Sequence, residues 1–170
     1  MVRIREAFPI DTEAIVEVNA SGWRAAYPGI VPARHLQDLP ISTWRHDVRS
    51  GLRAPEGDSF TRIADLDGVV AGYCYVAAPA GGEPEGSRIA ELVAIYVEPA
   101  FWRSGIGREL AHAAISEARE RSYEEIVLWT FEDNRRGLAF YKALGWEPDG
   151  GRRPHRATGV STVSLRRALP

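Results

Sequence analysis

The sequence predicts a mixed α/β fold, in which helices pack against one β-sheet. Short runs with continuous or alternating apolar residues recur along the chain, as is typical of strands. Other stretches carry apolar residues at every third or fourth position, as is typical of amphipathic helices. With 170 residues and no internal repeat, the chain is long enough for one core and short for two. We therefore expect a single domain over residues 1–170.

Six strands follow from these patterns. Val2-Arg3-Ile4-Arg5 alternates apolar and basic residues, which suits a half-buried strand. Asp67-Gly68 indicates a hairpin between the second and third strands. Glu125-Ile126-Val127-Leu128-Trp129-Thr130 is compact and apolar, which suits a strand buried on both faces. The predicted strands cover residues 2–5, 59–65, 69–78, 88–97, 125–130 and 160–167.

Four helices are expected between these strands. Asp11 can cap the first, which runs to about Arg24. Asn134 is well placed to cap the last, and Gly145 ends it. The predicted helices cover about residues 11–24, 33–39, 106–121 and 134–144. Stretches rich in glycine, proline and charge predict loops over residues 49–58, 80–86 and 150–156.

Composition argues against several classes of function. The net charge of −2 lacks the basic character of nucleic-acid-binding proteins, so we expect no nucleic-acid partner. No run approaches the roughly 18 apolar residues of a membrane helix, and the first residues have no apolar signal core. Cys74 is the only cysteine, which excludes an internal disulfide. We expect a cytoplasmic protein with no membrane partner.

Several polar residues have ordinary explanations. The four histidines show no metal-ligand spacing, so we expect no metal and assign them surface or capping roles. Cys74 lies in an apolar strand, which predicts a buried, inert thiol. Arg152, Arg153 and Arg156 either reach a phosphate or an acidic acceptor, or belong to a solvated basic loop.

The segment between the central strand and the long helix predicts an anion site. The chain passes from Glu91–Val97 through Arg103-Ser104-Gly105-Ile106-Gly107-Arg108 directly into the helix. The two glycines let a ligand approach the backbone, and the amides of a first helical turn point outward with partial positive charge. Two flanking arginines favour a phosphate or pyrophosphate over a plain glycine turn. The spacing of these glycines does not match the common nucleotide-binding loops.

These residues, together with a second block, resemble the GCN5-related N-acetyltransferases (the GNAT family). The loop of that family reads Gln/Arg-x-x-Gly-x-Gly/Ala; here Trp102 stands at its first position and the basic residue follows at Arg103. Downstream, residues 134–146 (Asn-Arg-Arg-Gly-Leu-Ala-Phe-Tyr-Lys-Ala-Leu-Gly-Trp) match the family's Asn, Phe-Tyr and Gly-Phe segment, with Trp146 for the usual Phe.

The resemblance implies a mostly antiparallel sheet of about six to seven strands, with helices on both faces and a splayed central pair of parallel strands. It also implies acetyl-CoA as cosubstrate, and many relatives pair as homodimers. The pantetheine arm would pair with the central strand, where a main-chain amide would hold the acetyl oxygen. The residues expected to bind the cosubstrate are Ile95, Tyr96, Val97, Arg103, Ser104, Gly105, Ile106, Gly107, Arg108, Asn134 and Tyr141.

Acetylation of an amine requires a base and an acid. Glu91 resembles in position the glutamate that some relatives use as base, although such glutamates are also often surface groups; Glu98 and Asp133 are alternative carboxylates. Tyr141 lies seven residues after Asn134, so both share one helix face. By the resemblance, Tyr141 is the general acid that protonates or hydrogen-bonds the leaving thiolate.

The acceptor is expected to be a small-molecule primary amine. Trp23 and Tyr27 belong to an aromatic segment that either lines the acceptor pocket or packs a helical lid onto the sheet. One alternative is acetylation of a protein N-terminus or lysine. The other is a non-catalytic module that binds or senses acyl-CoA.

Overall fold

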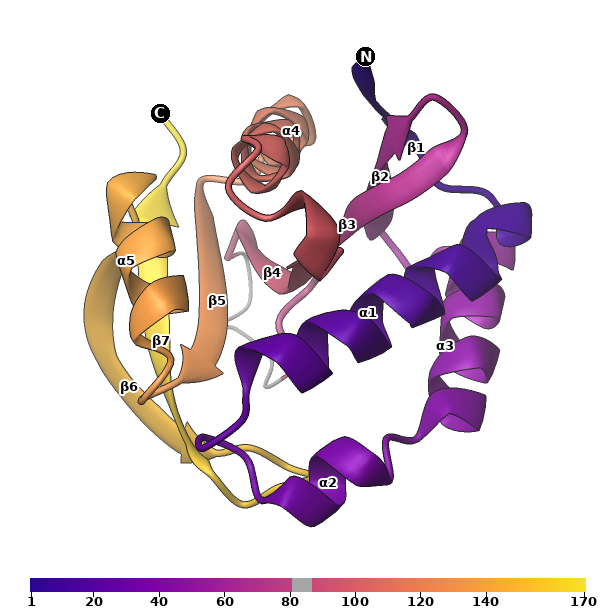
Figure 1. Ribbon diagram of the computed structural model, residues 1–170. Helices are drawn as coiled ribbons and strands as arrows, with labels where there is room; N and C mark the ends of the chain where they lie inside the picture. Colours follow the sequence, from indigo (N-terminus) through magenta and orange to yellow (C-terminus); the bar gives the residue numbers. More distant parts are fainter. Residues whose placement is uncertain (81–86) are drawn as a thin grey trace.

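The computed structural model describes residues 1–80 and 87–170, and its strands form one seven-stranded sheet of order β1-β2-β3-β4-β5-β7-β6 (Figure 1). Neighbouring strands are antiparallel except β4 and β5, which are parallel. This confirms the predicted mixed, mostly antiparallel sheet. The strands are β1 (Val2–Glu6), β2 (Phe60–Leu66), β3 (Val69–Ala77), β4 (Ile89–Val97), β5 (Glu125–Phe131), β6 (Glu147–Pro154) and β7 (Ser161–Ala168).

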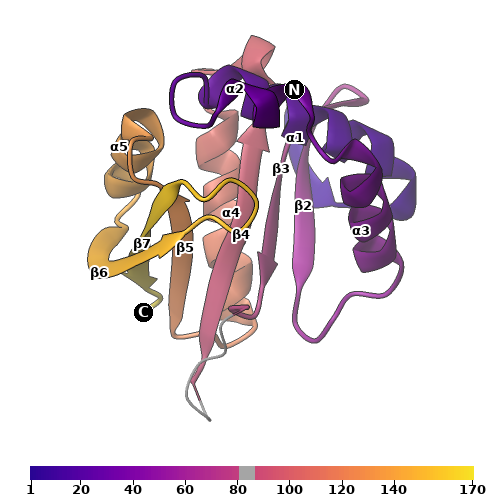
Figure 2. The same cartoon turned by 90° about the horizontal axis from the view of Figure 1, so that it is seen from below.

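Helices cover both faces of the sheet, as predicted (Figure 2). On one face, Ile15 of α1 and Leu52 of α3 pack with Ile63 and Tyr73. On the other face, α4 packs over β2, β3 and β4, and α5 packs against the same core, to which β5 and β7 also contribute. No helix in the described part of the chain is long and apolar enough to cross a membrane. The helices are α1 (Thr12–Ala26), α2 (Ala33–Gln37), α3 (Ile41–Arg53), α4 (Ile106–Glu120) and α5 (Arg135–Ala143), with 3-10 turns η1 (Pro9–Asp11) and η2 (Pro99–Phe101).

The two parallel strands separate after a short paired stretch. β4 pairs with β5 only from Ile89 opposite Glu125 to Glu91 opposite Val127. The remainder of β4 stays paired with β3 on its other side, with a register shift opposite Tyr75 and Val76. The sheet therefore opens between the C-terminal halves of β4 and β5, which confirms the predicted splayed pair.

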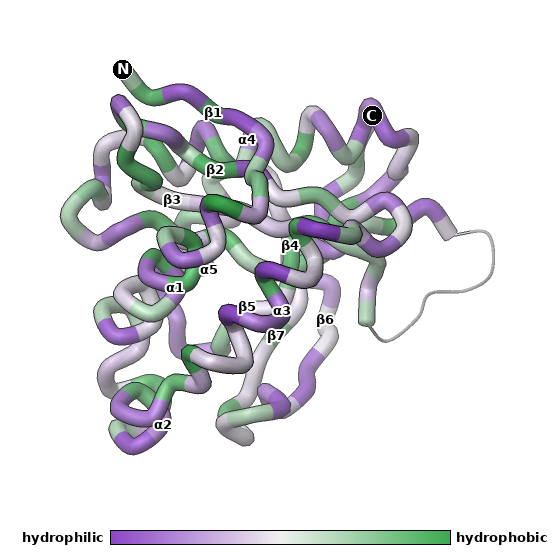
Figure 3. Tube along the Cα trace, turned by 90° about the vertical axis from the view of Figure 1, so that its right-hand side faces the viewer, coloured by the Kyte–Doolittle hydropathy of each residue, from purple (hydrophilic) through white to green (hydrophobic). Residues whose placement is uncertain are grey.

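Two predicted loops are wrong. α3, which was not predicted, occupies part of the expected loop over 49–58 and ends at Arg53. Its apolar residues Ile41, Trp44, Val48 and Leu52 keep helical spacing until shortly before Pro55. β6 occupies most of the expected loop over 150–156, although its sequence is hydrophilic (Figure 3). A strand with two prolines is tolerated there because β6 is the edge of the sheet. The predicted loop over 80–86 lies, beyond residue 80, outside the described residues.

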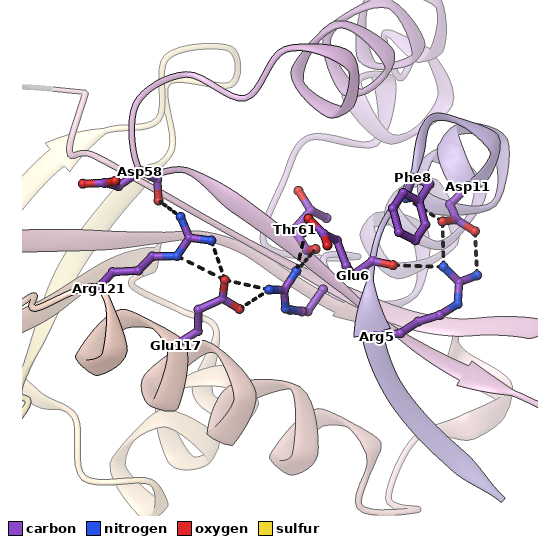
Figure 4. A network of polar contacts seen from close by, with 9 residues as sticks. Arg5, Glu6, Phe8, Asp11, Asp58, Thr61, Glu117 and Arg121 are labelled. Carbon is purple, nitrogen blue, oxygen red and sulfur yellow. Dashed lines mark hydrogen bonds and ion pairs between the residues drawn. The ribbon is translucent and has the colours of Figure 1, made fainter.

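The predicted capping role of Asp11 is also wrong. α1 begins at Thr12 and has no side-chain hydrogen bond at its N-cap. The Asp11 carboxylate instead accepts a hydrogen bond from the Phe8 amide at 2.8 Å and pairs with Arg5 at 2.8 Å (Figure 4). Asp11 therefore links β1 to η1. It does not cap α1, because Arg5 and the Phe8 amide already occupy its carboxylate oxygens.

Candidate active site

The predicted glycine loop joins η2 to α4. Gly105 is the N-cap of α4 and has a φ of +94°, a left-handed conformation that favours glycine. Hydrogen bonding of the helix begins at Arg108 and Glu109, whose amides both donate to the Gly105 carbonyl. The amides of Ile106 and Gly107 therefore precede this ladder and lie at the positive end of the helix dipole.

A cavity of about 430 Å³ lies beside this loop, and we call it the loop cavity. Ser104 and Ile106 do not line it: the Ser104 hydroxyl donates to the Phe101 carbonyl at 2.6 Å, and the Ile106 side chain is buried in the core. The other residues expected to bind the cosubstrate do line it: Ile95, Tyr96, Val97, Arg103, Gly105, Gly107, Arg108, Asn134 and Tyr141.

The walls of the loop cavity are strongly basic. Among the described residues, three arginines and no carboxylate line it; the third, Arg136, was not predicted. Its guanidinium stacks on the Trp102 ring at 3.5 Å, and the Trp102 Nε1 donates to the Val97 carbonyl at 2.8 Å. Burial and the charge of Arg103 lower the pKa of Arg136. The one hint of Arg136 in the sequence was Trp102, which stands where the family pattern has Gln or Arg and so left the loop without its usual polar side chain.

Asn134 caps α5, as predicted. Its Oδ1 accepts a hydrogen bond from the Gly137 amide at 3.0 Å, and its Nδ2 donates to the Thr130 Oγ1 at 3.1 Å. A Cβ at Gly137 would overlap the Asn134 amide, so a larger residue there would displace the cap. Asn134 thus anchors the start of α5 to the end of β5, beside the opening of the sheet.

Tyr141 projects from α5 into the wall of the loop cavity. Its ring contacts those of Phe140 and Trp146 edge to face, at centroid distances of 5.3 and 6.0 Å. Burial raises the pKa of the Tyr141 phenol, and the nearby Tyr27 raises it further. The phenol therefore keeps its proton at neutral pH, which an acid requires.

A second cavity, of about 550 Å³, lies on the side of the sheet covered by α1 and α3. We call it the aromatic cavity. Trp23 and Tyr27 both line it, so the structure brings together the two residues predicted for the acceptor site. Trp44, at the end of the same aromatic segment, lines it too, and so does Tyr96, which was predicted to bind the cosubstrate. Four further ring-bearing residues come from distant segments and were not predicted for this site: Tyr73, Trp129, Phe131 and His155.

Glu91 also lines the aromatic cavity and is only 7% exposed, so it is not a surface group. Its Oε1 lies 3.8 Å from a guanidinium nitrogen of Arg153, which in turn stacks on Trp129 at 3.9 Å. The alternative carboxylates, Glu98 and Asp133, line neither cavity. Glu98 instead accepts a hydrogen bond from the Ser21 hydroxyl at 2.5 Å.

The two cavities meet at a pair of tyrosines, since Tyr27 and Tyr96 line both. Their hydroxyl oxygens lie 3.1 Å apart, which is hydrogen-bonding distance. Burial raises the pKa of both phenols. The structure thus places Tyr141 in one cavity and Glu91 in the other, with this pair between them.

His155 and Cys74, for which the sequence predicted no part in a site, lie in different surroundings. His155, expected in a surface or capping role, is half-buried and also lines the aromatic cavity, with its ring 5.6 Å from that of Trp23. Burial lowers its pKa, and Arg153 contributes to the shift. Cys74 is fully buried, and burial raises its thiol pKa to about 12, as expected of an inert thiol. Within the described residues, no group of three metal-ligating side chains comes together.

Comparison with known sequences agrees with this architecture. The sequence model of the acetyltransferase (GNAT) family matches residues 20–146. A mycothiol acetyltransferase of Saccharomonospora viridis is 26% identical over 86% of this chain, which covers 46% of that protein. One from Amycolatopsis mediterranei is 33% identical over 80% of this chain and 42% of its own length. The chain therefore spans less than half the length of these relatives.

Solved structures share the fold at low sequence identity. The PaiA N-acetyltransferase from Thermoplasma acidophilum, in complex with coenzyme A, superposes with a TM-score of 0.81 at 18% identity, covering 99% of both chains. The ribosomal-protein-S18-alanine N-acetyltransferase from Escherichia coli gives a TM-score of 0.72 at 17% identity, covering 99% of this chain and 94% of that one. With its sheet order, splayed strands and matched sequence, the chain belongs to the acetyltransferase (GNAT) family.

Proposed function

We propose that this chain is a single acetyltransferase domain that transfers an acetyl group from acetyl-CoA to the primary amine of a small molecule. One observation carries the proposal: two cavities meet at Tyr27 and Tyr96, beside the opening between β4 and β5. Two substrates that occupied them would meet at that pair. A cavity of about 550 Å³ lined by rings suits a small acceptor better than an extended polypeptide.

The loop cavity fits the polyphosphate end of the cosubstrate. Arg103, Arg108 and Arg136 supply positive charge, and the first-turn amides of α4 add donors aimed at an anion. Beyond Glu91, the edge of β4 that faces β5 is left without strand pairing. That edge offers main-chain groups to an extended chain, in the manner of an added strand.

The cosubstrate supplies an activated acetyl group as a thioester. Glu91 accepts a proton from the ammonium of the acceptor, directly or through water, so that the neutral nitrogen attacks the acetyl carbonyl carbon. A main-chain amide near Ile95–Val97 donates to the carbonyl oxygen as negative charge develops. The carbon–sulfur bond breaks, and Tyr141 donates its proton to the departing sulfur. The nitrogen releases its second proton as the amide forms, and this proton returns through water to the Tyr141 oxygen. The products are an N-acetyl amine and a free thiol.

Thermal unfolding with acetyl-CoA tests this assignment, with ADP and NAD at the same concentration as controls. A ligand that binds only the native state adds about 2.7 kcal/mol at a hundred times its Kd, which shifts the melting temperature by several degrees. We expect that shift with acetyl-CoA alone, and thiol release when an accepted amine is added. No shift would reject acetyl transfer. A shift with no thiol release from any amine or peptide would favour a non-catalytic acyl-CoA-binding module.

A further inference from the structure

We propose that the acceptor amine carries an anionic group, a carboxylate or a phosphate, on an aromatic or other flat apolar body. The inference rests on the proposed function but concerns the aromatic cavity alone. It follows from the walls of that cavity, which combine flat rings with two arginines at one edge of the sheet.

The rings form a continuous wall rather than isolated residues. Trp23 lies at centroid distances of 5.0 Å from Tyr27, 5.8 Å from Trp44 and 5.9 Å from Phe131. These contacts hold the rings in fixed orientations, so the cavity presents rigid, flat apolar surface. Such a surface favours a planar or apolar body, whereas a flexible polar chain would leave its polar groups without partners.

The charges of the cavity favour an anion. Arg153 and Arg156 line it, and the only described lining carboxylate is Glu91, which lies 3.8 Å from Arg153. Among the described residues, no carboxylate pairs with Arg156. His155 adds little positive charge, because burial lowers its pKa. The described residues of the wall therefore carry a surplus of positive charge, which would repel a protonated amine and which an anionic group on the acceptor removes.

The two ends of the cavity serve different groups. The tyrosine pair marks the end next to the loop cavity, where the amine must arrive. Arg153 comes from the end of β6 and Arg156 from the turn that follows. Arg153 is held in place by its stack on Trp129 at 3.9 Å and is still 43% exposed, so its planar donors remain accessible to an oxyanion.

Matched pairs of amines test the inference. Phenylalanine is compared with phenethylamine, para-aminomethylbenzoate with benzylamine, and O-phosphoethanolamine with ethanolamine. Each pair differs by one anionic group, and the first two place a carboxylate near to the amine or far from it. We expect the anionic member of at least one aromatic pair to have a kcat/KM about tenfold higher. Spermidine serves as a polycationic acceptor and should be poor. Calorimetric titration with coenzyme A present measures binding without turnover.

Two variants locate the effect. Arg156→Ala changes an exposed side chain and should raise KM for the anionic acceptor about tenfold, with little change for its uncharged partner. Arg152→Ala is the matched control. Arg152 is a nearby exposed arginine that pairs with Glu132 and does not line the cavity. Its substitution should therefore leave KM unchanged for both the anionic and the uncharged acceptor.

The outcomes separate this inference from the proposed function. Equal use of both members of every pair, preference for the uncharged member, or a preference that survives Arg156→Ala would overturn the inference. So would the absence of transfer and binding for every amine while acetyl-CoA still stabilises the protein. Loss of stabilisation by acetyl-CoA would instead reject the proposed function.

Discussion

Tyr141 is the residue whose proposed role depends most on its surroundings. Its phenol lines the loop cavity, and burial keeps it protonated. We expect Tyr141→Phe to lower kcat about a hundredfold, the usual contribution of a general acid, with little change in acetyl-CoA affinity. Steady-state kinetics with calorimetric binding measures both. Tyr123 lines neither cavity, so Tyr123→Phe should change neither kcat nor the affinity for acetyl-CoA. An unchanged kcat with several amines would remove Tyr141 from the mechanism.

Arg136 is the second residue whose proposed contact with the cosubstrate can be tested by substitution. Its stack on Trp102 places a charge at the loop, where the family pattern has its Gln or Arg. We expect Arg136→Ala to weaken acetyl-CoA binding about tenfold and to reduce the dependence of that binding on salt, because a charged contact to phosphate is lost. Arg135→Ala is the control, since Arg135 is a neighbouring exposed arginine that does not line the cavity. Equal effects of the two changes would mean that only net charge matters.

At the scale of elements, the contact between α1 and β4 sets the position of the tyrosine pair. A Cβ at Gly22 would lie 2.7 Å from the Tyr96 Cδ1, whereas a Cβ at Gly51 of α3 would meet nothing within 4 Å. Gly51→Ala should therefore stabilise the protein by up to about 1 kcal/mol, by reducing the entropy of the unfolded chain. Gly22→Ala should instead destabilise it by about 1 kcal/mol, through overpacking, and should lower activity by displacing Tyr96. Urea unfolding of both variants measures these changes; two changes of the same sign would contradict the argument.

The same scale explains what the sequence could and could not predict. The glycine loop and α4 are contiguous, and helical spacing defines them without tertiary information. β6 was missed because its two prolines and two glycines show no alternation; only its place at the sheet edge, beside β7, makes it a strand. α3 was missed as a whole, and its last residues were assigned to a loop because Gly51 and Pro55 suggested one, although the apolar spacing continued to Leu52.

At the scale of the whole molecule, the aromatic cavity could not be predicted. Its rings come from α1 and the residue after it, from α3, from β3, β4 and β5, and from the residue after β6, which only the complete fold brings together. Trp23, Tyr27 and Trp44 lie in one aromatic segment of the sequence, whereas Tyr73 and Trp129 gave no local signal of a shared site. Arg152, Arg153 and Arg156 were noticed as a basic cluster, but the place of Arg153 and Arg156 at this cavity depends on the pairing of β6 with β7.

The whole molecule also buries several groups that ionise at alkaline pH. Burial raises the pKa of Tyr73, Tyr96, Tyr141 and Cys74, so the folded state holds their protons more tightly than the unfolded chain does. When the unfolded state binds fewer protons, the free energy of unfolding falls as pH rises. Stability should therefore decline above the lowest unfolded pKa of this group, which is that of Cys74.

Cys74 can be isolated from the tyrosines, because its ordinary pKa of 9.0 lies below theirs of 10.0 and its folded value is about 12. Between about pH 8 and pH 10 the unfolded thiol ionises while the folded thiol stays neutral. The protein should then lose on the order of 1 kcal/mol of unfolding free energy through this residue. Cys74→Ala should lose less stability than the parent over the same interval, even though the variant is less stable at both values because a buried side chain is truncated. Urea unfolding at the two pH values gives the difference. Equal losses of stability in both proteins would mean that Cys74 is not buried as a neutral thiol in the folded state. The core between β3 and α4 would then be more open than the structure shows, where the Cys74 Sγ lies 3.6 Å from the Leu110 carbonyl oxygen.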